Sequence, residues 1–168
     1  MKKFFTWRDD WSLGVELIDR QHHQLAVLLN SMAELYLNSK GETDAEQRAG
    51  LLKEQLKMLC EKTREHFNDE EGLMLEAGYP DHPEHAREHR MLIAELRYYL
   101  RDIEEERENI NKSVLISLKT WYISHIIKSD KEFVDFLQAQ SQNKTIPAQA
   151  ISMQRQVAGV VGKTVSRS

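Results

Sequence analysis

The pentapeptide His85-Ala86-Arg87-Glu88-His89 places two histidines four residues apart. Residues four apart lie one above the other on the same face of a helix, with about 6 Å between their Cβ atoms. The two imidazoles are therefore close enough to hold one metal ion. This spacing alone is weak evidence, because two histidines four apart occur by chance in many helices.

Further histidines and acids stand elsewhere in the chain at positions that face the interior of predicted helices. They are His22, the pair His66 and Glu70, and the pair His125 and Asp130. A single histidine on an apolar stripe is more often a hydrogen-bonded core residue than a ligand. Five histidines and two acids in one core would carry a heavy desolvation cost unless cations lay among them. We therefore predict a site for two metal ions inside a helical bundle.

The spacing of apolar residues predicts four amphipathic helices. We expect the first over residues 17–37 and the second from an N-cap at Thr43 or Asp44 to about residue 77. The third follows the turn at residues 78–81 and ends near residue 105, and the fourth runs over residues 112–137. His22 falls on the apolar stripe of the first helix, whereas its neighbour His23 does not. The short connections favour an all-α fold, an antiparallel up-down-up-down four-helix bundle with an N-terminal arm. We expect residues 1–138 to form this bundle domain.

Segments at the two ends of the chain differ from the predicted helices. Residues 1–14 form an arm rich in aromatic side chains, which we expect to lie across the bundle because an exposed stretch of this kind would be a sticky patch. Residues 139–168 form a C-terminal tail that begins with Gln, Ser and Asn and continues with a weak apolar series. The tail is either disordered or docks as a short helix on the bundle or on a protein partner.

Composition excludes several classes of function. The net charge of −4 comes without a basic cluster, so we expect no nucleic-acid partner. No apolar run approaches the roughly 18 residues of a membrane span, and no secretory signal forms at the N-terminus. The single cysteine, Cys60, suits a reducing compartment, so we expect a cytoplasmic protein.

The ligand types indicate which metal is bound. Five imidazoles with two carboxylates favour iron, and the absence of thiolate ligands weakens the case for structural zinc. Only carboxylates can bridge two ions with two oxygens, so Glu70 and Asp130 are the natural bridges. The spacing of His125 and Asp130 is awkward, because five residues turn an ideal helix by about 140°. Both side chains reach one site only from opposite shoulders of the stripe, or if the helix widens locally. Periodicity alone does not select Asp130 over Asp135.

Four segments of the chain together resemble the bacterial hemerythrin family. They are residues 18–22, 66–71, 79–89 and 121–130, and all seven ligand positions match in order and spacing. The similarity extends from Trp7 to about Leu137. The resemblance implies a four-helix bundle with a non-haem di-iron centre that binds O2 reversibly, and it selects Asp130 over Asp135.

The resemblance also assigns the ligands to individual irons. It implies that His85, His89 and His125 complete the coordination of one iron. The other iron would be held by His22 and His66, leaving an open place for O2. Glu70 and Asp130, together with an oxo or hydroxo group, would bridge the two ions.

Helical proximity to the ligands nominates five residues to line an O2 pocket: Leu25, Leu118, Trp121, Tyr122 and Ile126. Tyr122 either donates a hydrogen bond to O2, narrows the pocket, turns its hydroxyl to solvent, or is an ordinary half-buried tyrosine. We expect O2 carriage, storage or delivery and no enzymatic activity. The alternatives are an oxygen or redox sensor acting through a partner, and a di-iron enzyme that handles peroxide or NO.

Overall fold

The computed structural model describes residues 4–37, 45–105 and 110–145. Every regular element within these residues is helical, which confirms the all-α fold. The long helices are α1 (Glu16–Leu37), α2 (Ala45–Ala77), α3 (His82–Glu104) and α4 (Lys112–His125). A π-helical turn, η2 (Ile126–Asp130), follows α4 and leads into α5 (Lys131–Thr145). Across the described ranges, no helix is long and apolar enough to cross a membrane.

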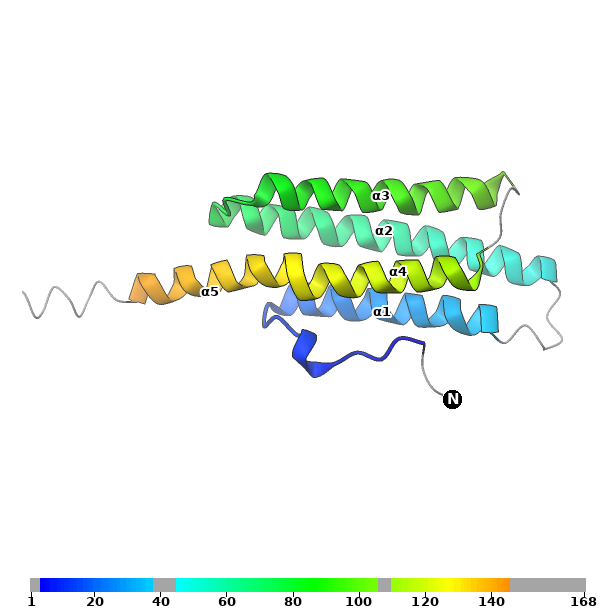
Figure 1. Cartoon of the computed structure of the whole chain (residues 1–168), viewed down its shortest axis with the longest axis horizontal. Coiled ribbons are helices and arrows are strands. Elements are labelled where there is room, and N and C mark those ends of the chain that lie inside the picture. The colour runs from blue at the N-terminus through cyan, green and yellow to red at the C-terminus, as the bar shows by residue number, and fades with distance from the viewer. Residues whose placement is uncertain (1–3, 38–44, 106–109, 146–168) are drawn as a thin grey trace, which may run out of the picture. The chain divides into compact units, whose positions relative to one another are not determined.

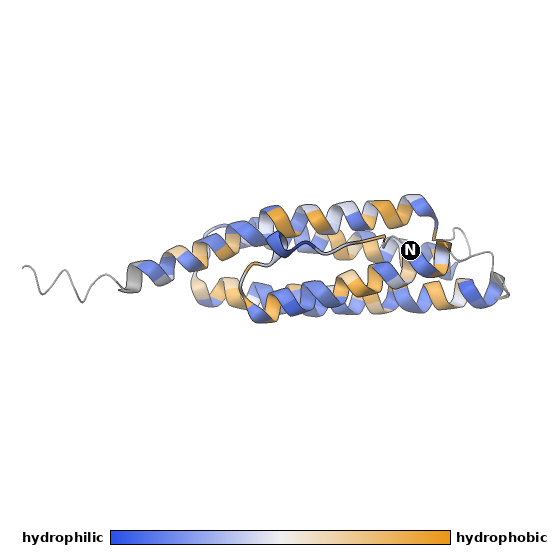
Figure 2. Cartoon of the chain, turned by 90° about the horizontal axis from the view of Figure 1, so that it is seen from below, coloured by the Kyte–Doolittle hydropathy of each residue, from blue (hydrophilic) through white to orange (hydrophobic). Residues whose placement is uncertain are grey.

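Helices α1 to α4 form the expected antiparallel four-helix bundle (Figure 1). Helix α1 packs against α2 and α4, and α2 packs against α3. Polar residues cover much of the outward surface of these helices, as Figure 2 shows. The chain divides into two compact units, residues 1–133 and 134–168, and all seven predicted ligands belong to the first unit.

The connection between α2 and α3 reverses the chain at Gly78. This glycine has φ of +65°, a left-handed conformation that glycine adopts without steric cost. The Gly78 N–H donates to the Leu75 carbonyl, and the Tyr79 N–H donates to the Met74 carbonyl at 2.9 Å. These two bonds are the Schellman arrangement that ends many helices. The predicted stop after residue 77 is therefore confirmed, and it places His66 and His85 on adjacent antiparallel helices.

The buried faces of the helices largely follow the predicted stripes. Leu25, Leu29 and Leu56 are almost fully buried, and His22 is buried while His23 is exposed. One difference occurs in α2, where the predicted inward residue Leu73 is only half-buried and Met74 is fully buried. Met74 follows Glu70 by four residues, so the buried face continues from that ligand by one helical turn.

The C-terminal helix is longer than the sequence pattern predicts. We expect a helix end near Leu137, but α5 continues to Thr145. The exposed polar residues Ser141 and Gln142 therefore belong to a helix. The remainder of the predicted tail, residues 146–168, lies outside the described residues.

The N-terminal arm is bound to α1 and α4. The Asn30 side chain accepts a hydrogen bond from the Phe5 N–H and donates one to the Phe5 carbonyl, both at 2.8 Å. From α4, the Lys119 ammonium donates to the Phe4 carbonyl at 2.6 Å. The Phe5 ring is 1% exposed and lies 5.7 Å from the Tyr122 ring. The arm thus covers the seam between α1 and α4, as the aromatic composition predicts (Figure 2).

Replacement of Asn30 by alanine should loosen the arm, because it removes both hydrogen bonds to the backbone of Phe5. We expect Asn30→Ala to lower the free energy of unfolding by about 1–3 kcal/mol in urea denaturation. The matched control is Asn68→Ala, which truncates an exposed asparagine on α2 and should change stability by less than about 0.5 kcal/mol. Equal effects of the two substitutions would contradict this account of the arm.

Candidate metal centre

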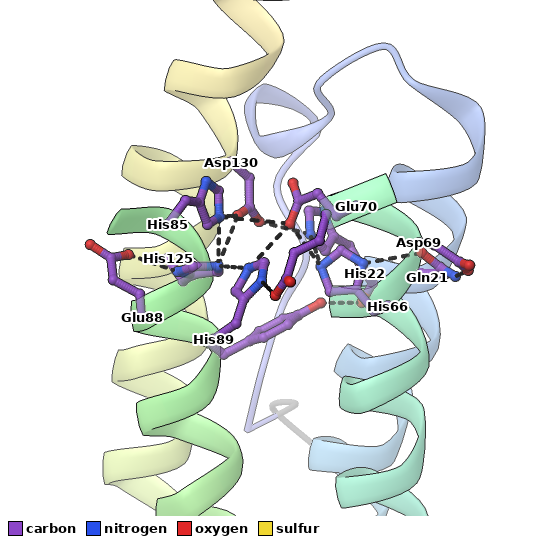
Figure 3. Close-up of polar contacts among 12 residues, drawn as sticks. Gln21, His22, His66, Asp69, Glu70, His85, Glu88, His89, His125 and Asp130 are labelled. Atoms are coloured by element: carbon purple, nitrogen blue, oxygen red, sulfur yellow. Dashed lines mark hydrogen bonds and ion pairs between the residues drawn. The ribbon is translucent and has the colours of Figure 1, made fainter. Parts of the chain in front are cut away.

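Four helices and the π-helical turn η2 bring seven ionisable side chains together in the bundle core (Figure 3). The one-turn spacing of each pair on α2 and α3 aims both of its members inward. Each of the seven side chains belongs to a residue that is 5% exposed or less. They are His22 on α1, His66 and Glu70 on α2, His85 and His89 on α3, His125 on α4, and Asp130 in η2.

The π-helical turn explains the awkward spacing at the C-terminal end of α4. In this turn the Lys131 N–H donates to the Ile126 carbonyl, five residues earlier. A turn closed by such bonds accommodates an extra residue, so five residues come closer to one full turn. Asp130 therefore faces the core on the same side as His125, and its side chain is fully buried. Asp135, the alternative acid, is exposed.

One group of ligand atoms comes from three helices and η2. Its imidazoles are those of His85, His89 and His125, and the Nε2 atom of His125 lies 3.2 Å from that of His85 and 3.0 Å from that of His89. The carboxylate atom Asp130 Oδ1 lies 3.0 Å from His125 Nε2. Glu70 Oε2 lies 3.4 Å from His89 Nε2. These five residues can place ligand atoms within 4.8 Å of one another.

A second group lies beside the first and shares Asp130 with it. The Nε2 atoms of His22 and His66 are 3.2 Å apart, and Asp130 Oδ2 lies 3.0 Å from His22 Nε2. The two oxygens of Asp130 therefore face different groups. Glu70 Oε2 is 3.9 Å from His66 Nε2, so this carboxylate also lies between the groups. The second group contains two histidines and the first contains three, so the second group has fewer ligands.

The distances within each group are those expected around a metal ion. Two ligand atoms about 2.1 Å from an ion are about 3.0 Å apart when they meet it at a right angle. The Nδ1 atoms of His89 and His125 both face carboxylates, so their Nε2 lone pairs face one another at 3.0 Å and gain nothing without a shared cation. Both oxygens of Glu70 and both of Asp130 also lack a hydrogen bond of acceptable geometry, although they are buried. Such unsatisfied buried acceptors are costly, and bound cations would satisfy them.

Burial lowers the pKa of His66 and His89 and so favours their neutral, metal-binding forms, whereas the Asp130 carboxylate raises the pKa of His125 despite its burial. Burial lowers the pKa of His66 to about 3, and the nearby imidazole of His22 adds to this effect. Burial raises the pKa of Glu70 well above its ordinary value, and the adjacent carboxylate of Asp130 raises it further. Two carboxylates this close cannot both remain ionised cheaply unless positive charge lies between them.

Acceptor groups outside the centre set the tautomers of three imidazoles. Glu71 Oε1 lies 2.9 Å from His89 Nδ1, and Glu88 Oε2 lies 3.3 Å from His125 Nδ1. A carboxylate can only accept, so each Nδ1 carries the proton and each Nε2 presents its lone pair to the core. Glu88 is itself held by the Ser129 hydroxyl, which donates to it at 2.6 Å.

The second group has a neutral partner of this kind. The Gln21 carbonyl oxygen lies 3.1 Å from His66 Nδ1, and its amide donates to the Asp69 carboxylate at 2.6 Å (Figure 3). The first group thus has two carboxylates behind its imidazoles, whereas the second has an amide. Sequence reasoning missed Gln21, Glu71 and Glu88 in this role. Each directly precedes or follows a predicted ligand in the sequence, which is the only signal that could have nominated them.

Aromatic rings surround the imidazoles. The Phe67 ring stacks on the His89 ring at 3.7 Å with an interplanar angle of 7°, although sequence reasoning did not single out Phe67. The Trp121 ring stacks on that of His125 at 5.2 Å. Of the five predicted pocket residues, Trp121 is half-buried and the other four are buried: Leu25, Leu118, Tyr122 and Ile126.

Tyr122 lies beside the second group. Its ring is 6.0 Å from the His22 ring, and its hydroxyl donates to the His22 backbone carbonyl at 2.5 Å. Burial raises the pKa of this phenol well above its ordinary value, so it stays protonated as a donor. The hydroxyl is therefore turned neither to solvent nor into the space between the ligands, and Tyr122 joins α4 to the backbone of a predicted ligand on α1.

Comparison with known proteins agrees with this geometry. The family described as "Hemerythrin HHE cation binding domain" matches residues 13–137. The bacteriohemerythrin of Stenotrophomonas maltophilia (strain R551-3) is 28% identical over 162 residues, covering 96% of this chain and 95% of that protein. The myohemerythrin of Sipunculus nudus is 25% identical over 129 residues, covering 77% of this chain and 90% of that protein. The crystal structure of wild-type hemerythrin superposes with a TM-score of 0.69 at 23% identity, over 80% of this chain and 98% of that one. The chain therefore belongs to the bacterial hemerythrin family.

Proposed function

We propose that this protein holds two iron ions in its core and binds O2 reversibly, in carriage, storage or delivery of oxygen. The observation that carries the proposal is the pair of buried ligand groups that share Asp130. Imidazole with carboxylate is a donor set suited to iron. The reducing environment that ferrous iron needs agrees with a cytoplasmic location and with the free thiol of Cys60.

We assign the ligands to the two irons as the geometry groups them. His85, His89 and His125 would hold one iron, and His22 and His66 would hold the other. Asp130 would bridge through its two oxygens, and Glu70 would bridge from α2. The iron with two histidines would keep an open place for O2. When bound, the ions supply the electrons that O2 accepts reversibly.

The charge of the ligand set supports binding of O2 without oxidation of a substrate. Two ferrous ions bring four positive charges, of which two carboxylates and one hydroxide offset three. The five remaining ligands are neutral imidazoles, so the centre stays cationic. A ligand set of this kind disfavours the high-valent iron that oxidation chemistry requires, in contrast to sites rich in carboxylate.

The surroundings of the ligands support the same proposal. Leu25, Leu118 and Ile126 are buried apolar residues near the ligands, and Phe5 closes this side of the bundle from the arm. A dry pocket slows the delivery of protons to bound oxygen and so slows its irreversible loss. The hydroxyl of Tyr122 is engaged with the His22 carbonyl, and this contact favours a structural role over proton transfer in an enzyme.

The proposal predicts both a metal content and a spectrum. The purified chain, loaded anaerobically with ferrous salt, should contain two irons per chain by elemental analysis. Admission of air should produce a visible absorption band, and removal of O2 should abolish it over repeated cycles. Fewer than two metals per chain, or a band that does not reverse, would contradict the proposal.

Adjacent histidines on α1 provide a matched pair of variants. His22→Ala removes a buried ligand, so the iron content should fall below two per chain and the reversible band should be lost. His23→Ala removes an exposed imidazole whose ring lies 4.2 Å from that of Trp7, and it should keep both iron and band. Two intact irons in the His22 variant would show that the second group is assigned wrongly.

Substitution of Tyr122 tests whether its hydroxyl has a structural role or contacts bound O2. Tyr122→Phe removes one buried hydrogen bond, so the free energy of unfolding should fall by about 1 kcal/mol. Iron content and the position of the oxygen-dependent band should stay as in the unmodified protein. A shifted band or faster loss of bound O2 would show that the phenol acts at the oxygen site.

A further inference from the structure

A surface pocket between α2 and α3 lies directly against the metal centre. Its volume is about 380 Å³, and the residues that line it include His89 and Glu71. Glu71 is hydrogen-bonded to His89 Nδ1 at 2.9 Å, and its side chain is 30% exposed. A single imidazole therefore separates this pocket from the atoms that face the proposed iron.

The pocket is basic although the chain as a whole is acidic. Three guanidinium groups, those of Arg64, Arg90 and Arg97, line it together with the one carboxylate of Glu71, which gives a local charge of +2 (3 − 1). The whole chain carries −4. All three arginines are exposed, and no ion pair to any of them is recorded among the residues that the structure describes.

The positive charge extends beyond the pocket along α3. Arg90 and Arg97 are seven residues apart, so they lie on one face of the helix. Arg101 follows four residues later and lines an adjoining pocket of about 640 Å³ together with Arg97, the exposed Tyr98 and one acid, Glu104, so that this pocket also has more cationic than anionic groups. The stripe from Arg90 to Arg101 is about 16 Å long, at about 1.5 Å per residue. This length exceeds the diameter of a single small anion, and it suits the small contact area of a transient complex between redox proteins.

A protein that binds O2 reversibly needs a supply of electrons to restore its ferrous state, and the basic surface suits a protein that delivers them. This step rests on the proposed function: only the ferrous centre binds O2, and oxidation to the diferric state stops it until electrons are supplied. We propose that the arginines 64, 90, 97 and 101 form the docking surface for an acidic one-electron donor protein, and that electrons enter the centre through His89.

The electron balance of this step is simple. In each encounter the donor loses one electron and one ferric ion becomes ferrous, so two encounters restore the diferrous pair. Protons taken up from water balance the charge that is added to the centre. The arginines take no part in the chemistry. They attract the acidic donor and hold it where the stacked rings of Phe67 and His89 give a short, packed path to the metal.

The experiment uses the full-length, iron-loaded protein in its diferric state and reduced flavodoxin, a small acidic one-electron donor, as the probe. The rate of reduction is followed by stopped-flow absorbance at several salt concentrations. The double variant Arg64→Gln/Arg97→Gln should be reduced about tenfold more slowly at low ionic strength. It should also lose most of the decrease in rate that salt causes in the unmodified protein.

Two controls separate docking from damage to the centre. The double variant Arg20→Gln/Lys112→Gln makes the same change of charge at exposed residues on α1 and α4, and it should be reduced as fast as the unmodified protein. The cationic methyl viologen radical should reduce the Arg64/Arg97 variant without the tenfold loss, which shows that the centre is intact.

The outcomes distinguish this proposal from the proposed function. Equal flavodoxin rates for the two double variants would overturn the docking surface, even if O2 binding is reversible. Loss of rate with both donors would also overturn it, because the substitutions would then act on the centre. The reversible oxygen band is recorded on the same samples. Its absence would count against O2 binding alone, because reduction of the diferric pair is measured without it.

Discussion

The fold depends on one constraint, which is that seven ionisable side chains share a core from which water is excluded. An apolar interior tolerates a neutral imidazole with a hydrogen-bond partner, but it does not tolerate two unsatisfied carboxylates side by side. Glu70 and Asp130 are in that position, with no hydrogen bond to any of their oxygens. Cations bound between them would convert a destabilising cluster into a set of metal bonds. Metal binding would then be thermodynamically linked to folding.

The partners behind the imidazoles make the two halves of the centre electrostatically different. The carboxylate of Glu71 accepts a hydrogen bond from His89 and that of Glu88 lies 3.3 Å from Nδ1 of His125, whereas the amide of Gln21 faces the second group. A carboxylate makes its imidazole a stronger donor toward a metal than an amide does. The half with three histidines therefore favours the more positive ion. The half with two histidines has fewer ligands, and a neutral amide instead of a carboxylate is hydrogen-bonded to its His66 imidazole. Both properties suit the site that we assign to O2.

The bundle is closed around the second group by parts of the chain far apart in sequence. Tyr122 links α4 to the His22 carbonyl, and the Phe5 ring lies 5.7 Å from that of Tyr122. Asn30 fixes the backbone of Phe5 to α1. The opposite face, between α2 and α3, has exposed arginines beside His89 instead. One side of the centre is thus apolar and covered by the arm, and on the other side the buried His89 separates the centre from a polar surface pocket, which suits separate routes for O2 and for electrons.

The amino-acid sequence by itself determined the four helices and the inward positions of the ligands, because both follow from a period of 3.6 residues that repeats within each helix. The distinction between His22 and His23 is of this kind. Periodicity did not determine the place of Asp130, since the π-helical turn at Ile126–Asp130 depends on a widened backbone that no apolar stripe encodes. The roles of Glu71, Glu88 and Gln21, and the pocket beside His89, were likewise decided only by the tertiary structure. Each depends on side chains from different helices meeting across an interface, and the spacing within one helix carries no information about its neighbour.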